Sequence, residues 1–183
     1  MKKVAVLLAE GFEEIEALTV VDIVRRVGIT CDMVSIGNID VTGAHEIVVK
    51  ADKCIGDDLK EYDLLVLPGG MPGARNLQNH QELIEFIKYF NENNKLIAAI
   101  CAAPIVLAKA DIIKGKDITS YPGFDKELKG CNYKEENVVV DGNIITSRGP
   151  ATAMEFSYKL LELLGNKNYI ELKEGMMYNS LIK

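Results

Sequence analysis

The sequence predicts an α/β fold, a three-layer αβα sandwich built around a mostly parallel sheet. Apolar runs of strand length alternate with segments of helical periodicity along the chain. Several of these runs are apolar throughout rather than at every second residue, which is typical of strands that are buried on both faces of a parallel sheet. At 183 residues, 48% of them hydrophobic and 26% charged, the chain is long enough to bury such a core.

The first elements predict a strand, a crossover helix and a second strand. The strand at Lys3–Leu8 is followed by a helix over Glu13–Val27, which begins with acidic residues and ends with arginines, as the helix dipole favours. A strand at Thr30–Ile36 comes next, and a right-handed crossover makes it parallel to the first. Residues 41–49 predict a short hairpin with Gly43 at its turn, an excursion from the βαβ pattern.

The rest of the chain continues the alternation. We expect strands at 63–67, 96–100 and 117–120, helices at 81–93, 148–164 and 167–177, and a hairpin of 137–141 with 143–147 around Asp141-Gly142. The sequence contains no internal repeat and no low-complexity linker. Residues 1–183 are therefore expected to form one domain.

Composition and charge exclude several classes of function. The net charge is −6 and the only basic cluster is Arg25-Arg26, so nucleic acid is not expected to be a primary partner. No stretch approaches the roughly 20 apolar residues of a membrane span, and the first residues lead into a strand rather than a signal peptide, so we expect a cytoplasmic protein without membrane partners. Four cysteines, at 31, 54, 101 and 131, show no C-x-x-C pair and no neighbouring histidine. We therefore expect no metal, no cofactor and no disulfide framework.

Cys101 is the leading candidate for a reactive residue. It follows the strand at 96–100 directly, and Pro104 indicates that a helix starts just after it. Ala99 and Ala103 stand two positions away on either side, the spacing of the G-x-S-x-G nucleophile turn of hydrolases. This geometry places a thiol at the carboxyl edge of the sheet and at a helix N-terminus, where the thiolate is favoured. The alternative is that Cys101 is one more small apolar core residue.

Glu16 is the second candidate. It shares a helix face with Val20, Ile23 and Val27, and is the only carboxylate on that apolar stripe. Burial raises the pKa of a carboxyl group, which would leave Glu16 protonated and able to donate a hydrogen bond. The alternative is that it only complements the helix dipole. Because the first and central strands of a doubly wound sheet lie close together, we expect Glu16 to reach Cys101.

A glycine-rich stretch and two histidines are further candidates for functional residues. The glycine-rich stretch Pro68–Ala74 ends a strand and exposes backbone N–H groups, which suit either a phosphate or an oxyanion. It matches neither G-x-G-x-x-G nor a Walker pattern, so oxyanion stabilisation is the better interpretation if Cys101 is reactive. His45 and His80, the only histidines, are expected on the solvated surface.

Four motifs together resemble the ThiJ/PfpI superfamily, whose domain is of the class I glutamine amidotransferase-like type. They occupy residues 10–16, 66–70, 98–104 and 146–150, in the family's order and at similar spacing. The resemblance is nearly full length, and is strongest to the branch of the parkinsonism-associated protein deglycase and bacterial YajL. It implies a flavodoxin-like fold and a homodimer.

The resemblance also implies roles for four residues. Cys101 falls on the family's reactive cysteine, Glu16 on its protonated glutamate partner, and Gly70 with Ala102 on its backbone oxyanion donors. Members of this branch sense oxidation and act as glyoxalases, deglycases or chaperones. We expect a cysteine-dependent stress-response protein in which the Cys101 thiolate adds to a small aldehyde such as methylglyoxal, or to a glycated substrate. The alternative is a non-catalytic redox sensor or chaperone that acts through oxidation of Cys101.

Two departures from the family pattern limit the chemistry. Protease-type members have a histidine directly after the cysteine, whereas this chain has Ala102, so we expect no protease activity. One member of the nearest branch has a nearby histidine where this chain has Tyr121, and Asp22, which resembles that histidine's acidic partner, loses its role. Base catalysis must then come from Glu16 or from water.

Overall fold

A computed structural model describes residues 2–180 of the chain. Its centre is a seven-stranded sheet in the order β10-β11-β7-β6-β1-β2-β5, in which every neighbouring pair is parallel except the antiparallel pair β10–β11. The strands are β1 (Lys3–Leu8), β2 (Thr30–Ser35), β5 (Lys53–Cys54), β6 (Leu64–Leu67), β7 (Leu96–Ile100), β10 (Val138–Asp141) and β11 (Ile144–Ser147). The predicted mostly parallel sheet is confirmed.

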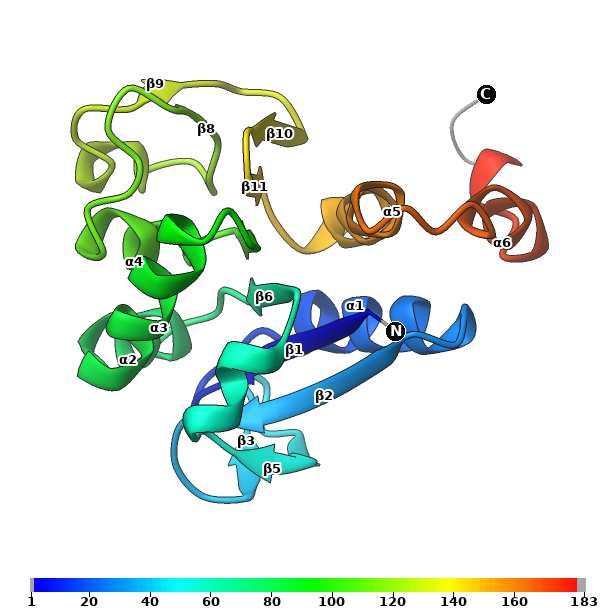
Figure 1. Ribbon diagram of the computed structural model, residues 1–183, viewed down its shortest axis with the longest axis horizontal. Helices are drawn as coiled ribbons and strands as arrows, with labels where there is room; N and C mark the ends of the chain where they lie inside the picture. The colour runs from blue at the N-terminus through cyan, green and yellow to red at the C-terminus, as the bar shows by residue number, and fades with distance from the viewer. Residues whose placement is uncertain (1, 181–183) are drawn as a thin grey trace.

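Helices cover both faces of this sheet (Figure 1). On one face lie α1 (Glu14–Arg26) and α5 (Ala153–Leu163), with α6 (Tyr169–Gly175) beyond α5; on the other lie α2 (Gly73–Asn79), α3 (Gln81–Glu92) and α4 (Pro104–Lys109). Alternate residues of β1 enter the two cores, Val4 and Val6 on the α1 side and Ala5 and Leu7 on the α3 side. This explains why the strand is apolar throughout rather than at every second residue.

The elements outside the main sheet agree only in part with those expected from the sequence. The hairpin expected at residues 41–49 is the separate antiparallel ribbon β3 (Asp40–Thr42) and β4 (Val48–Lys50). The strand expected at 117–120 is only β8 (Asp117–Ile118), which pairs with β9 (Asn132–Tyr133) outside the main sheet. The helix expected from 148 begins as the 3₁₀ turn η3 (Pro150–Thr152) before α5.

Several short elements were not expected. They are the strands β5 and β9, the helix α2 and the 3₁₀ turns η1 (Asp57–Glu61) and η2 (Asp125–Glu127). All are too short to show a periodic pattern in the sequence. A last 3₁₀ turn, η4 (Tyr178–Ser180), follows α6. Over residues 2–180, no helix combines the length and the apolar character that crossing a membrane requires.

Candidate active site around Cys101

Cys101 lies on a tight turn at the end of β7, as its small neighbours predict. Its φ is +64°, in the left-handed region that costs a non-glycine residue about 1–2 kcal/mol. Both of its backbone polar groups are bonded: its N–H donates to Ser147 O and its carbonyl accepts from Tyr121 N–H, each at 2.9 Å. Since α4 begins only at Pro104, residues 101–103 form a turn, and the sulfur is less directly at a helix N-terminus than the sequence suggested.

The loop after β6 approaches Cys101 so closely that one of its positions must be glycine. A Cβ atom on Gly69 would lie 2.7 Å from the Cys101 Cβ, 2.7 Å from Glu16 Oε2 and 3.0 Å from the Ala102 N. Contacts this short do not occur between real atoms of these types. Gly69 therefore allows the cysteine turn, the glutamate and the loop to meet at one point.

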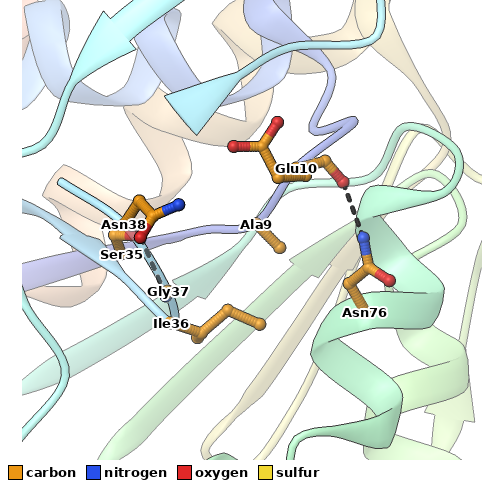
Figure 2. Close-up of a pocket in the computed structure, with 7 residues that line it drawn as sticks. All are labelled: Ala9, Glu10, Ser35, Ile36, Gly37, Asn38 and Asn76. Carbon is orange, nitrogen blue, oxygen red and sulfur yellow. Dashed lines mark hydrogen bonds between the residues drawn. The ribbon is translucent and has the colours of Figure 1, made fainter. Parts of the chain in front are cut away.

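A second loop, which follows β1, fixes the start of α1 beside this point. Glu13 N–H donates to Gly69 O at 3.0 Å, and Gly73 N–H donates to Gly11 O at 3.1 Å. The Asn76 side-chain amide on α2 donates to the backbone carbonyl of Glu10 at 2.8 Å, as Figure 2 shows. These bonds hold α1 in register with the glycine-rich loop, which sets the position of Glu16.

Figure 2 also shows the hollow that this contact borders, at the ends of β1 and β2. Its volume is ≈ 240 Å³, and it is lined by Ala9, Glu10, Ser35, Ile36, Gly37, Asn38 and Asn76. Glu10 is the only ionisable group among these lining residues, and none of them is a cysteine or histidine. Cys101 therefore is not part of the lining of this hollow.

Glu16 is a fully buried carboxyl group with one bonded oxygen. Its relative exposure is 0%, and Oε2 accepts a hydrogen bond from Gly69 N–H at 2.7 Å. The other oxygen, Oε1, has no partner with hydrogen-bond geometry among the described residues. Burial raises the pKa of Glu16 to about 7, although the neighbouring Cys101 thiol and the Gly69 N–H both act to lower it. Near neutral pH the group is therefore present in both protonation states, and Oε1 is the position left for its proton.

The Cys101 sulfur interacts with all three of the other residues that the sequence assigned to the site. Glu16 and the backbone N–H groups of Gly70 and Ala102 are the groups that act on the pKa of its thiol. Burial raises the pKa of the Cys101 thiol, and the Glu16 carboxylate raises it further, while the two N–H groups lower it. The expectation of a depressed thiol pKa is therefore wrong: burial disfavours the thiolate, and the neighbouring Glu16 carboxylate disfavours it further. Glu16 and Cys101 behave as a pair that competes for one proton.

His45 is exposed, as expected, but it is hydrogen-bonded to Glu14. It lies in the turn between β3 and β4 with 65% of its side chain exposed. Its backbone N–H donates to Glu14 Oε1 at 2.8 Å, and its Nδ1 lies 2.7 Å from Glu14 Oε2 and 3.8 Å from Glu13 Oε1. The hydrogen bond with Glu14 raises the pKa of the His45 imidazole. This latch between the ribbon and α1 depends on how the hairpin folds back, which local sequence does not reveal.

The same three side chains satisfy the spacing of metal ligands. One ligand atom from each of Glu13, Glu14 and His45 lies within 4.8 Å of the others. The short contact between Glu14 and His45 accounts for their proximity without an ion. The second histidine, His80, begins α3 and accepts a hydrogen bond from Leu83 N–H at 3.2 Å, so its role is that of a helix cap.

The other residues that the sequence singled out lie apart from this chemistry or support it. Asp22 pairs with Arg26 at 2.6 Å on the exposed side of α1. Cys31 is buried, Cys54 exposed and Cys131 half-buried; all are free thiols. Tyr121 lies beside Cys101, to which its backbone is bonded, and its side chain is 48% exposed.

Comparison with known proteins gives a consistent result. Residues 2–163 match the DJ-1/PfpI family. The chain is 40% identical over 183 residues to the Parkinson disease protein 7 homolog of Danio rerio, covering 96% of this chain and 97% of that protein. It is 41% identical over 167 residues to the putative cysteine protease YraA of Bacillus subtilis, covering 89% and 98%. The longer Protein DJ-1 homolog B of Arabidopsis thaliana is 34% identical over 179 residues, and the match spans 96% of this chain but only 41% of that protein.

A solved structure agrees with the fold as well. The structure of oxidized DJ-1 from Toxoplasma gondii superposes with a TM-score of 0.91 at 36% identity, covering 97% of this chain and 98% of the other. The resemblance drawn from the four sequence motifs is thereby confirmed, and so is the flavodoxin-like fold that it implied. By the extent of the match, the level of identity and the shared fold, this chain belongs to the DJ-1/PfpI family.

Proposed function

We propose that this protein is a cysteine-dependent stress-response enzyme that converts small reactive α-oxoaldehydes, such as methylglyoxal, into hydroxy acids. One observation supports it above the others. A half-buried thiol, a carboxyl group with a pKa near 7 and two backbone N–H donors meet at the carboxyl edge of the sheet. A nucleophile, a proton carrier and oxyanion donors are the groups that addition to a carbonyl requires.

The chemistry balances without an external oxidant. The Cys101 sulfur bonds to the aldehyde carbon as its proton passes to the Glu16 carboxylate, and the N–H groups of Gly70 and Ala102 stabilise the developing oxyanion. Glu16 returns the thiol proton to the oxyanion, which gives a neutral hemithioacetal and frees the carboxylate. The carboxylate then moves the proton of the former aldehyde carbon to the neighbouring ketone carbon, while the hydroxyl proton of the hemithioacetal passes to the ketone oxygen. The first carbon is oxidised to a thioester and the second is reduced to an alcohol. Water cleaves the thioester, which releases the hydroxy acid and regenerates the thiol.

A direct assay tests this proposal. Purified protein is mixed with methylglyoxal, and lactate formation is followed against the Cys101→Ser and Glu16→Gln variants. Lactate is expected from the wild type alone above the background of the Cys101→Ser protein. Equal lactate formation by wild type and Cys101→Ser would refute the proposal.

Redox sensing through Cys101 is the second candidate. It is supported by the same hydrogen-bond donors, which suit an oxidised sulfur as well as an oxyanion, and by the oxidized state named for the Toxoplasma relative. Each peroxide would oxidise the sulfur by two electrons, first to the sulfenic and then to the sulfinic acid, and leave as water. Intact and peptide mass spectra after mild peroxide should show oxygen on Cys101 before the other cysteines. In the Glu16→Gln variant, oxidation should persist while lactate formation is lost.

We do not extend the proposal to proteolysis. Peptide cleavage needs a general acid for the amine leaving group, and the residue after the nucleophile is Ala102. His45 is bonded to Glu14 and His80 caps α3, so neither is assigned to the sulfur. Casein and short fluorogenic peptides should remain uncut over hours.

We also propose that two copies of this chain pair as a homodimer. Large apolar side chains are exposed on α1 and on the neighbouring ribbon, at Ile15 (56%), Ile47 (52%) and Val48 (63%). His45, in the turn of the same ribbon, bonds to Glu14 on α1, so the two segments lie side by side. Light scattering after gel filtration should give twice the chain mass, and Ile15→Asp should reduce it to the monomer mass.

A further inference from the structure

An apolar groove next to Cys101 has no place in the chemistry described above. Its volume is ≈ 260 Å³, and its lining includes Tyr121 and Pro122 on one wall and Gly149 and Pro150 on the other. The two walls are built by the segments that bond to the backbone of Cys101. The Tyr121 N–H donates to the Cys101 carbonyl, and Ser147, two residues before Gly149, accepts from the Cys101 N–H. Both walls of the groove are therefore tied to the backbone of Cys101.

The polar side chains of the lining are already bonded elsewhere. Asn137 Nδ2 donates to Glu155 at 3.1 Å, Arg148 Nη1 donates to the Glu135 carbonyl at 2.8 Å, and Thr152 Oγ1 donates to the Gly149 carbonyl at 2.9 Å. The tyrosine ring, the proline rings and the glycine backbone supply most of the lining surface, while Arg148 keeps its positive charge and further N–H donors. Such a surface gains from an apolar group.

Gly149 sets the width of this groove. A Cβ atom at this position would lie 3.2 Å from Cδ2 and 3.6 Å from Cε2 of the Tyr121 ring. The φ of Gly149 is 173°, which any residue adopts, so the backbone itself does not require glycine. Tyr121 is 48% exposed and lines the apolar space of this groove.

We infer that this groove receives the substituent on the reactive carbonyl, so that the site prefers α-oxoaldehydes with an aryl or branched alkyl group over methylglyoxal. This rests on the proposed function for its catalytic part. Tyr121 and Gly149 are the specificity-determining residues. Additional apolar groups held in a pocket discriminate between substrates by roughly 10- to 200-fold per methylene-sized difference.

Two measurements test the groove, one with turnover and one without. In the first, the kcat/KM values of wild type are compared for phenylglyoxal, which gives mandelate, and methylglyoxal, which gives lactate. The Cys101→Ser protein is the blank that corrects for aldehyde consumed by reaction with arginine side chains. The ratio should favour phenylglyoxal by about 10-fold or more. Gly149→Ala should lower that ratio by about 10-fold, because its methyl group enters the space beside the Tyr121 ring.

Gly37→Ala is the matched control, because a Cβ atom there meets nothing within 4 Å, and it should leave the ratio unchanged. In the second measurement, calorimetry gives the Kd of mandelate and of lactate for the Cys101→Ser protein. Mandelate should bind about 10-fold more tightly, and adding Gly149→Ala should remove the difference.

The two proposals fail in different ways. If wild type turns over neither aldehyde above the blank, the proposed enzyme activity fails. The comparison of mandelate and lactate binding then still tests the groove proposal. If mandelate binds no better than lactate, or if the preference survives Gly149→Ala, the groove proposal is overturned whatever the turnover.

Discussion

The Glu16 carboxyl group on α1 accepts a hydrogen bond from Gly69 N–H at 2.7 Å, which joins the first helix to the glycine-rich loop after β6. This bond holds an ionisable group in a position with 0% exposure, beside a thiol. The same burial that raises the pKa of the group to about 7 makes its ionised form costly. Stability and activity should therefore respond in opposite directions as Glu16 loses its proton.

The first prediction concerns stability. Burial raises the pKa of Glu16 from about 4.5 to about 7, so the native state binds more protons than the unfolded state between these values. The free energy of unfolding should then fall by about 3 kcal/mol as the pH rises through this window. Glu16→Gln should remove this part of the pH dependence, as measured by urea unfolding at pH 4.5 and pH 8. The exposed Glu92→Gln serves as the control and should leave the slope unchanged; a slope that persists in Glu16→Gln would contradict the assignment.

The second prediction concerns the pH dependence of turnover. Because the Glu16 carboxylate takes the thiol proton, kcat/KM for methylglyoxal should rise with pH through an apparent pKa near 7. Glu16→Gln should lower kcat/KM by roughly 10²- to 10⁴-fold and abolish this inflection. Stopped-assay profiles from pH 5 to pH 9 measure both. An inflection that survives the substitution would assign the base to water or to another side chain.

The third prediction concerns the approach of the glycine-rich loop. Gly69→Ala places a methyl group 2.7 Å from the Cys101 Cβ and from Glu16 Oε2, so the loop must move away. We expect destabilisation of about 1–3 kcal/mol and loss of lactate formation. Gly37→Ala, in open space, should change neither urea midpoint nor rate. Wild-type behaviour of Gly69→Ala would show that the close approach is not needed.

The fourth prediction separates the cysteines by reactivity. Burial raises the pKa of Cys31 to about 12, whereas Cys54 is exposed. Under native conditions at pH 8, iodoacetamide should label Cys54 while Cys31 stays unmodified until urea unfolds the chain. Peptide mass spectrometry reads both sites. Early labelling of Cys31 would mean that β2 opens readily in the native state.

Most of the fold and much of the candidate site could be predicted from the local sequence. The strands β1 and β7 are recognisable as apolar runs because both of their faces are buried. Ala99 and Ala103 indicate the turn at Cys101 because a crowded junction needs small neighbours. The latch between His45 and Glu14 was not predictable, because it joins residues 31 positions apart in the chain. The local sequence does not indicate how the hairpin lies against α1.

The direction of the pKa shift of the Cys101 thiol could not be predicted from the sequence either. Motifs indicated that Glu16 and Cys101 meet, but the direction of the thiol pKa depends on how completely both are desolvated. Burial is a property of the packed molecule, and here it outweighs the two backbone N–H groups. The sequence therefore predicted the direction of the Glu16 pKa correctly and that of the Cys101 thiol pKa incorrectly.

The left-handed backbone of Cys101 has a further consequence for how this site can change over evolution. A side chain at φ +64° is tolerated only because the flanking segments hold the turn in place, and glycine would occupy it without strain. Mutational drift toward a more stable fold would thus tend to replace this cysteine. A cysteine at this position carries a backbone strain that glycine would not, a trade-off located at a single residue.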